Sequence, residues 1–256
     1  MDTTAVVVTH QSARVLESCL VRLAELPGLS VLVVDNASTD GSREIAAARG
    51  ILVLASGANS GFAAAANRGG RAAGSRLLCF LNPDCLLTAE TLDAARAALA
   101  HRPLACAVPD FEQGGAVLPG RQPGYTWRKV LADLMENNRR FPGVLRRLRA
   151  HAAHHDTTWH WPLGTCLFVP APLFQGLGGF DERYFLYMED VEFGWRLNRR
   201  GGEVVSLSTR VAHGGMQGAD VAPGLRRRLL NAARVQFARR HYGVLAGWVA
   251  RGLARP

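Results

Sequence analysis

Several features that define common protein classes are missing from this sequence. No charge-free apolar run approaches the roughly 18 residues that a membrane-spanning helix needs. The N-terminal "MDTTAVVVTH" has no basic segment ahead of its apolar residues, so we expect no signal peptide. The five cysteines are scattered and form no C-x-x-C pair, which is typical of small buried residues in a reducing compartment. We therefore expect a cytoplasmic protein.

Acidic residues are fewer than basic ones. The 256 residues include 30 Lys and Arg against 21 Asp and Glu, which gives a net charge of +9. Such an excess favours an anionic partner, and it concentrates in residues 139–155 and 225–241. The basic–aromatic interleaving of nucleic-acid-binding modules is absent, so we expect no nucleic-acid partner. Solvated helix faces remain the alternative explanation of both basic runs.

The first half of the chain alternates between strand and helix patterns. Short apolar runs predict strands at 5–9, 30–35, 51–55 and 76–81. Apolar residues at helical spacing predict helices at 12–26, 38–49, 62–74 and 88–101, the last with Thr88 as its N-cap. Apolar strands that alternate with helices indicate a parallel sheet covered on both faces. We therefore predict an α/β fold: a single Rossmann-like domain with a mostly parallel central sheet flanked by helices.

The second half shows a weaker pattern. Residues 109–160 are rich in turn formers and then in basic residues, with no clear periodicity. Further on, we predict a strand and a short helix within 164–180, a helix at 189–202, a strand at 203–208 and a basic amphipathic helix from about 222. No internal repeat or low-complexity linker divides the chain, so we expect one domain over residues 1–256.

Polar residues follow the apolar strands at the points where those strands end. In open parallel sheets, ligands bind outside the carboxyl ends of the strands. Each residue alone could simply shape a turn, but their joint placement at one sheet edge predicts a nucleotide-binding crevice. The residues are Thr9, His10, Asp35, Asn36, Asn82 and Asp84, together with Asn59 and Gly61 from the turn before the third helix.

The turn "LNPDC" at 81–85 carries one carboxylate, Asp84, directly after a buried strand. Pro83 fixes the backbone and removes a hydrogen-bond donor, which suits a rigid loop. A carboxylate beside a diphosphate is repelled unless a cation lies between them, and Mg²⁺ and Mn²⁺ are commonly held by one or two carboxylates plus phosphate oxygens. Asp84 is therefore a candidate metal ligand, with Asn82 as a neutral polar contact.

A second group lies in "GGFDERYFLYMEDVEFGWRL" at 178–197. Glu189 and Asp190 follow the aromatic residues Tyr184, Phe185 and Tyr187, on which a sugar can stack. Asp190 could be a helix N-cap. The alternative is a carboxylate in a pocket wall, where it could take a proton from an attacking hydroxyl.

These motifs together resemble the family 2 glycosyltransferases with the GT-A fold, and most closely their rhamnosyltransferase-like branch. The similarity covers roughly residues 4–243 in the family's order: "VVVTH", "VVDNASTDGS", "NSGFAAAANRG", "LNPDC", "GTCLFVP" and "GGFDERYFLYMEDVEFGWRL", then His213. The resemblance implies that Asp35 contacts the base and that Asn59, Gly61 and Asn67 line the nucleotide-sugar pocket. It also implies Asp84 and His213 as metal ligands and Asp190 as catalytic base. Trp161, Gly164 and Glu189 are expected at the acceptor.

The resemblance further implies an inverting transfer from a nucleotide-diphosphate sugar, either dTDP-rhamnose or a UDP-sugar, with a divalent cation, Mg²⁺ or Mn²⁺. The acceptor would be a saccharide or lipid-linked acceptor in cell-wall or surface polysaccharide synthesis. Residues 1–108 would bind the nucleotide-sugar, 160–220 the acceptor, and 222–256 would form the basic tail. Two residues depart from the family pattern: Asn82 replaces the first acid of the D-x-D motif, and Gln11 stands where an asparagine is usual.

Two other enzyme classes that bind nucleotides lack their signatures in this sequence. A dinucleotide-dependent oxidoreductase needs G-x-G-x-x-G after a strand, and a nucleotidyltransferase needs a Gly-rich loop after the first strand; both patterns are missing. A catalytically inactive nucleotide-sugar-binding homologue remains the alternative. A zinc site at His151, His155 and His160 lacks a residue to complete its shell.

The basic tail is expected to contact either the inner face of an anionic membrane, as a peripheral protein does, or a lipid-linked acceptor. The residues on which this rests are Arg226, Arg227, Arg228, Arg234, Arg239 and Arg240, alongside Leu229, Leu230, Val235 and Phe237.

Overall fold

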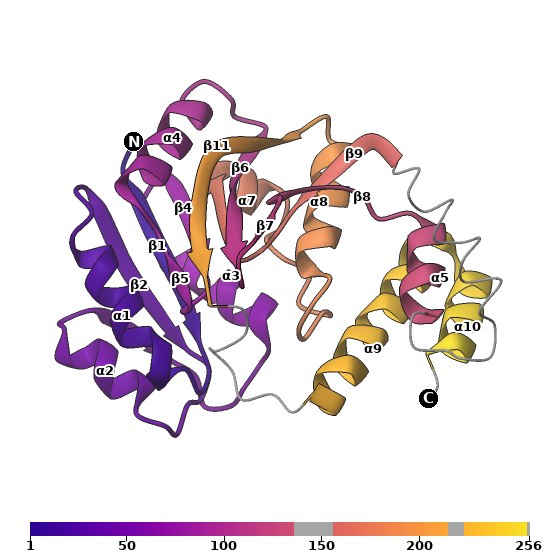
Figure 1. The fold of residues 1–256 in the computed structure, drawn as a ribbon, viewed down its shortest axis with the longest axis horizontal. Helices are drawn as coiled ribbons and strands as arrows, with labels where there is room; N and C mark the ends of the chain where they lie inside the picture. The colour runs from indigo at the N-terminus through magenta and orange to yellow at the C-terminus, as the bar shows by residue number, and fades with distance from the viewer. Residues whose placement is uncertain (136–155, 215–222, 255–256) are drawn as a thin grey trace.

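The computed structural model describes residues 1–135, 156–214 and 223–254. Within them a nine-stranded sheet forms the centre of the molecule (Figure 1). Its strands are β1 (Thr3–Thr9), β2 (Leu29–Asp35), β3 (Leu52–Ala55), β4 (Leu77–Leu81), β5 (Cys85–Leu86), β6 (Ala105–Gln113), β7 (Ala116–Leu118), β10 (Cys166–Pro170) and β11 (Glu203–His213). Neighbours follow the order β3-β2-β1-β4-β10-β6-β11-β5, and β7 pairs with β6.

Six of the nine strands in the sheet run in the same direction. β3, β2, β1 and β4 run parallel to one another, and β11 runs parallel to β6. β10 is antiparallel to both β4 and β6, and it joins the two halves of the sheet. The mostly parallel sheet predicted from the apolar runs is therefore confirmed, with antiparallel β10 at its centre and the short strands β5 and β7 also antiparallel to their partners.

Helices cover both faces of the sheet. On one face, α1 (Ala13–Ala24), α2 (Ser42–Ala48) and α4 (Ala89–Leu99) contribute side chains to one apolar core. On the other face, α3 (Phe62–Ala72), α7 (Ala171–Gly176) and α8 (Glu189–Arg199) contribute to a second core. Thr88 caps α4 as expected, because its hydroxyl accepts a hydrogen bond from the backbone N–H of Thr91. Both buried faces follow from the helical spacing of apolar residues.

The prediction of irregular structure from residue 109 was wrong. β6 extends to Gln113 and pairs with β10 and β11 inside the sheet. Pro109 lies within this strand, and its presence discourages a strand interpretation of the sequence. Beyond β6, β8 (Arg121–Gly124) and β9 (Asp156–Pro162) form a separate antiparallel pair.

The basic tail is two helices rather than one. α9 (Pro223–Tyr242) and α10 (Val244–Leu253) meet at Gly243, whose φ of +93° is a conformation that favours glycine. With α5 (Trp127–Met135) they pack around a third apolar core, at the end of the molecule opposite α1 and α2 (Figure 1). None of the described helices combines the length and the apolar character that crossing a membrane requires.

Several tail residues that were expected to face a membrane face the protein instead. Phe237 is fully buried in the third core. Arg234 pairs with Asp133 of α5 at 3.2 Å, and Arg226 donates a hydrogen bond to the hydroxyl of Tyr187 at 2.9 Å. These side chains hold α9 against the domain, because the apolar pattern of α9 is matched by an apolar surface on α5 and the 184–191 region.

Candidate active site

The polar strand ends lie together at one edge of the sheet. Thr9 at the end of β1 stands opposite Asp35 at the end of β2, and Leu81 pairs with Val7 just before the 82–84 turn. The ring of His10 hydrogen-bonds through Nδ1 to the carbonyl of Asn36 at 2.9 Å. The register of the parallel strands therefore brings these residues to one edge of the sheet, where the sequence predicts the nucleotide-binding crevice.

Two buried polar atoms in this crevice have no hydrogen-bond partner among the described residues. They are the hydroxyl of Thr9 and one carboxylate oxygen of Asp35, and both residues are almost fully buried. The other carboxylate oxygen of Asp35 accepts the backbone N–H of Ser38 at 3.2 Å. A buried polar atom without a partner is costly, and a ligand that bonds to it removes the cost. These atoms suit the polar edge of a nucleotide base.

Asn59 and Gly61 shape the loop beside this crevice. The side-chain oxygen Oδ1 of Asn59 accepts a hydrogen bond from the side chain of Asn36 at 2.8 Å and another from the backbone N–H of Gly61 at 3.0 Å. Gly61 has φ +85°, and a Cβ there would collide with the backbone of Phe185. Glycine is thus required where the loop approaches the segment that leads to Asp190.

Gln11 completes the rim of the crevice. Its side chain accepts the backbone N–H of Thr39 at 2.8 Å and donates to the hydroxyl of Thr39 at 3.1 Å. Gln11 and Ala37 both have positive φ, 52° and 63°. Non-glycine residues in this region are strained and cluster at functional sites. Sequence patterns carry no signal for these two conformations.

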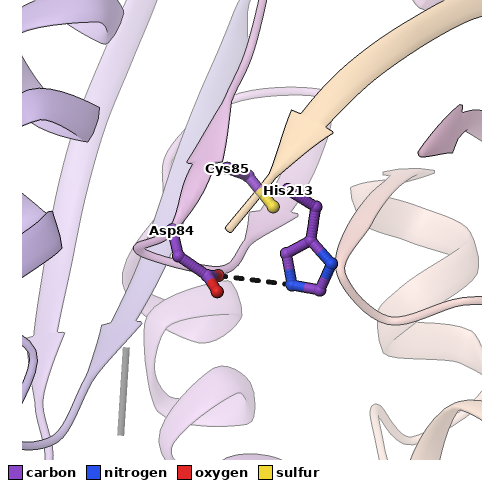
Figure 2. A group of neighbouring side chains, drawn as sticks. All are labelled: Asp84, Cys85 and His213. Atoms are coloured by element: carbon purple, nitrogen blue, oxygen red, sulfur yellow. Dashed lines mark ion pairs between the residues drawn. The ribbon is translucent and has the colours of Figure 1, made fainter. Parts of the chain in front are cut away.

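Asp84 and His213 meet at the end of β4 and β11. The Nε2 atom of His213 lies 3.4 Å from a carboxylate oxygen of Asp84, and the Cys85 thiol is the third potential ligand in the group (Figure 2). The three ligand atoms lie within 4.8 Å of one another. A carboxylate, an imidazole and open positions for phosphate oxygens suit Mg²⁺ or Mn²⁺. The expected pairing of Asp84 with His213 is present in the structure.

Cys85 does not fit as a ligand of a hard cation. Its side chain is fully buried, and its thiol donates to the carbonyl of Thr165 at 3.6 Å. Burial, followed by neighbouring acidic groups, raises the pKa of this thiol well above its usual value. Mg²⁺ and Mn²⁺ prefer oxygen and imidazole ligands to a thiol, so Asp84 and His213 are the residues that would hold such a cation.

Asp190 lies in the first turn of α8, and the N-cap position is Met188. Its carboxylate accepts the backbone N–H groups of Gly164 at 3.0 Å and Val191 at 2.8 Å. Burial raises the pKa of Asp190 to about 6, against the lowering effect of these hydrogen bonds. A carboxylate with this pKa is ionised at neutral pH and is still basic enough to accept a proton.

Glu189 is buried beside Asp190. It is 6% exposed, and its Oε2 atom has no partner among the described residues. Burial, and then the charge of Asp190, raises the pKa of Glu189 to about 8. The two neighbouring carboxyl groups thus have different protonation states at neutral pH, with Glu189 protonated and Asp190 ionised.

The backbone immediately before this pair is strained. Tyr187 and Met188 have φ values of 72° and 71°. Such a conformation in two consecutive non-glycine residues costs free energy and persists only where surrounding contacts enforce it. Arg226 of α9 supplies one such contact through the hydroxyl of Tyr187. The strain sets the direction in which Glu189 and Asp190 leave the loop.

A cavity of about 330 Å³ opens beside these two carboxyl groups. Trp161 of β9 and Tyr187 provide aromatic walls, as expected for a sugar site, and Trp161 is fixed by a hydrogen bond from its indole N–H to the carbonyl of Pro123 at 2.9 Å. Lys129 and Asp133 of α5 and Arg234 of α9 close the cavity. The sequence analysis missed these α5 residues, although Lys129 and Asp133 have the i,i+4 spacing of a helical ion pair.

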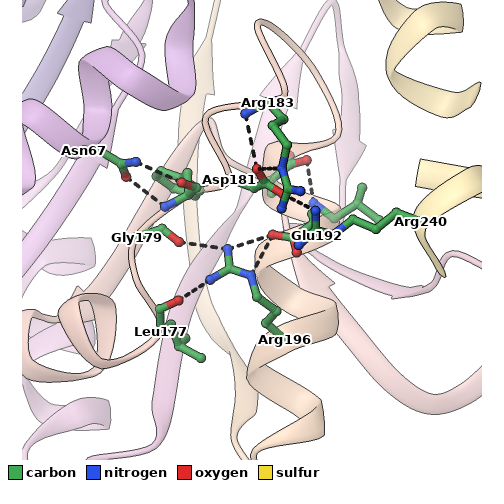
Figure 3. A network of polar contacts seen from close by, with 11 residues as sticks. Asn67, Leu177, Gly179, Asp181, Arg183, Glu192, Arg196 and Arg240 are labelled. Atoms are coloured by element: carbon green, nitrogen blue, oxygen red, sulfur yellow. Dashed lines mark hydrogen bonds and ion pairs between the residues drawn. The ribbon is translucent and has the colours of Figure 1, made fainter. Parts of the chain in front are cut away.

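Asn67 has a structural role in this arrangement. Its amide nitrogen donates to the carbonyl of Phe180 at 2.8 Å and to Glu182 at 2.9 Å, and its oxygen accepts the N–H of Phe180 at 2.8 Å. Figure 3 shows this clamp beside a second one, in which Arg196 binds Glu192 and the carbonyls of residues 177 and 179. Both clamps fix the loop that leads to Asp190. A contact of Asn67 with the nucleotide-sugar stays a prediction.

The other predicted positions are also accounted for. Asn82 donates its backbone N–H to the carbonyl of Thr165 at 2.9 Å. Nδ1 of His160 in β9 lies 3.0 Å from Arg121, whereas His151 and His155 lie outside the described residues. The zinc hypothesis at 151–160 therefore stays untested.

Comparison with known proteins agrees with this geometry. The model of the family described as Glycosyl transferase family 2 matches residues 4–160. The N-acetylglucosaminyl-diphospho-decaprenol L-rhamnosyltransferase of Mycobacterium tuberculosis is 33% identical over 216 residues, covering 77% of this chain and 70% of that protein. The chain belongs to glycosyltransferase family 2.

Similarity to solved glycosyltransferase structures shows that this chain has the GT-A fold. A structure of GalNAc-T7 with UDP, GalNAc and Mn²⁺ aligns with a TM-score of 0.65 and 16% identity over 93% of this chain. This chain spans about half of that one, 48%. The mannosyltransferase PcManGT from Pyrobaculum calidifontis, with GDP-Man and Mn²⁺, aligns with a TM-score of 0.63 and 18% identity, over 99% of this chain and 69% of its own. The predicted family and fold are therefore confirmed.

Proposed function

We propose that this glycosyltransferase is an inverting enzyme that moves a sugar from a nucleotide-diphosphate donor to a hydroxyl of a lipid-linked saccharide. The observation that carries the proposal is the pair Glu189 and Asp190, which line a cavity with aromatic walls and have pKa values raised to about 8 and about 6. Carboxyl groups with separated pKa values are typical of acid–base sites.

The donor would bind in the crevice at the ends of β1, β2 and β4. Its base would bond to Asp35 and Thr9, whose buried atoms lack partners among the described residues. Asp84 and His213 would hold a divalent cation, which would neutralise the charge on the diphosphate as it leaves. The Mn²⁺ in the structures of similar fold supports a divalent cation without selecting Mn²⁺ over Mg²⁺.

Asp190 would act as the general base. Its ionised carboxylate accepts the proton of the acceptor hydroxyl as that oxygen attacks the anomeric carbon, and the bond to the diphosphate oxygen breaks on the opposite face. One displacement of this kind inverts the anomeric centre. Glu189, protonated at neutral pH, can donate a hydrogen bond to the acceptor sugar. The Gly164 N–H keeps the Asp190 carboxylate in place.

The relative from Mycobacterium tuberculosis is named for rhamnosyl transfer to a lipid diphosphate carrying N-acetylglucosamine. Its similarity over most of this chain supports the same classes here: a deoxyhexose such as rhamnose from a dTDP donor, and an acceptor at the membrane. A UDP-sugar is the alternative donor. The protein would act in the cytoplasm at the inner face of the membrane, in cell-wall or surface polysaccharide synthesis.

A thermal-shift panel of dTDP-, UDP- and GDP-sugars with Mg²⁺ or Mn²⁺ tests the donor class. Only the matching donor with a cation should raise the melting temperature strongly, because bound ligand stabilises the native state. NMR of the anomeric proton should then show inversion in the product. Slow hydrolysis of this donor without acceptor separates an enzyme from an inactive binding homologue. Retention of configuration would contradict the mechanism.

A further inference from the structure

α10 exposes a group of large apolar side chains on its surface. Val244, Leu245, Trp248 and Val249 are 61%, 79%, 73% and 45% exposed. Their spacing of three, four and five residues places them on one side of the helix. Four large apolar side chains with this exposure on a single helix form a patch rather than isolated surface residues.

The opposite side of α10 is fixed to the protein. Gly247 and Ala250 are buried, and Ala250 and Leu253 belong to the third apolar core with α5 and α9. A Cβ on Gly247 would lie only 2.6 Å from the Cβ of Arg239, so glycine permits the close contact between α10 and α9. The apolar patch is therefore held outward by a well-packed helix.

The acidic and basic side chains of α9 and α10 themselves have one sign of charge. Residues 223–253 contain seven arginines and no Asp or Glu. Arg251 is exposed and lies seven residues after Val244, on the same edge of the helix. Arg239 of α9 is also exposed, and its Cβ lies next to Gly247 of α10. A self-association through this patch would bring these cations together, whereas an anionic surface would complement them.

We propose that the outer face of α10 inserts into the headgroup region of an anionic membrane. Leucine, valine and tryptophan beside arginine are the composition of helices that lie in the membrane interface, where apolar side chains enter the acyl boundary and cations meet lipid phosphates. α9 and α5, on which α10 packs, also supply walls of the cavity beside Asp190. Membrane contact would hold that cavity close to a lipid-linked acceptor. This last consequence rests on the proposed function, but the membrane contact does not.

Flotation with phosphatidylcholine vesicles, with and without phosphatidylglycerol, tests the contact directly. The wild type should bind the anionic vesicles, and the double variant Leu245→Glu, Trp248→Glu should bind at least about tenfold more weakly. Val21→Glu makes the same kind of change at a 41% exposed site on α1, at the far end of the molecule. This control should stay within about twofold of wild type, because it lies beyond the screening length from the bilayer.

Equal binding by the double variant, or an equal loss in Val21→Glu, would overturn the proposal. Sedimentation velocity provides the second measurement. If the wild type dimerises through α10 and does not bind vesicles, the patch is a contact with a second copy of this chain and the proposal is wrong. Transfer assays separate this result from the proposed function. The double variant should keep its rate on a short-chain soluble acceptor and lose rate on a vesicle-embedded one. If neither the wild type nor the variants transfer sugar but the wild type still binds anionic vesicles, the proposed function is refuted and the membrane contact is not.

Discussion

The backbone N–H of Gly164 donates a hydrogen bond to the carboxylate of Asp190 at 3.0 Å. The next residue, Thr165, accepts the backbone N–H of Asn82 at 2.9 Å, in the turn that carries Asp84. One short loop thus connects the proposed base to the proposed metal site. The Thr165–Asn82 contact joins two backbone groups and the Gly164 contact uses a backbone donor, so neighbouring positions of one loop hold both sites.

Asp84→Asn and His213→Gln should each weaken cation-dependent donor binding. Each change removes one of the two protein ligands, and we expect at least about a tenfold loss of affinity. Calorimetry with the donor, in Mn²⁺ and in chelator, measures this directly. Cys85→Ala is the matched control, because its buried thiol bonds to the carbonyl of Thr165 and is a soft ligand that Mg²⁺ and Mn²⁺ do not favour. Unchanged affinity in both ligand variants, or a loss in Cys85→Ala alone, would refute the assignment.

The rate of transfer should depend on the ionisation of Asp190. Since burial raises the pKa of this carboxyl to about 6, kcat/KM should fall about tenfold per pH unit below that value. Glu189→Gln should leave this acid limb in place, because Glu189, with a pKa raised to about 8, is already protonated there. Initial rates from about pH 4.5 to 8 provide the measurement. A profile that stays flat down to the lowest pH would count against a carboxylate base.

Glu189 should make stability depend on pH in a specific direction. Its pKa is raised in the folded state, from 4.5 to about 8, so folding favours its protonated form. That contribution is complete below pH 4.5 and is lost as the pH rises through about 8. Glu189→Gln lacks this titrating group and does not undergo this loss of stability. Its melting temperature should therefore rise relative to that of the wild type as the pH increases from 4.5 to about 8. Exposed Glu90→Gln is the control and should show no such trend.

Asn67→Ala should cost stability rather than donor affinity. The change removes two buried hydrogen bonds and one part-buried one, and it leaves the backbone groups of Phe180 without their partner. We expect a loss of about 2–4 kcal/mol in the free energy of unfolding, measured with urea. Donor affinity at a temperature where the variant is folded should change little. A stable variant with weak donor binding would instead place Asn67 in the nucleotide-sugar pocket.

Much of the sheet was predictable from local patterns. β1, β2 and β4 have apolar central residues because helices cover both faces, and parallel pairing places Thr9 beside Asp35. β6 (Ala105–Gln113) was not predicted at any of its residues, and Pro109 lies inside the strand, where tertiary contacts outweigh its poor strand propensity.

The acceptor side of the candidate site depends on distant segments. Lys129 and Arg234 are more than a hundred residues apart in sequence, and both reach the cavity only through packing of α5 against α9. The strained φ values of Tyr187 and Met188 also follow from tertiary contacts and have no signature in residue type. The tail was predicted as one membrane-facing helix, whereas packing buries Phe237 and leaves the face of α10 exposed.

The most direct test of the mechanism is single-turnover transfer by Asp190→Asn at saturating donor. Asparagine keeps the shape of the side chain and can still accept the Gly164 N–H, but it cannot take up a proton. We predict a transfer rate at least about 100-fold below wild type, with donor affinity and melting temperature nearly unchanged. A variant that transfers sugar within a few-fold of the wild-type rate would contradict the assignment of Asp190 as the catalytic base.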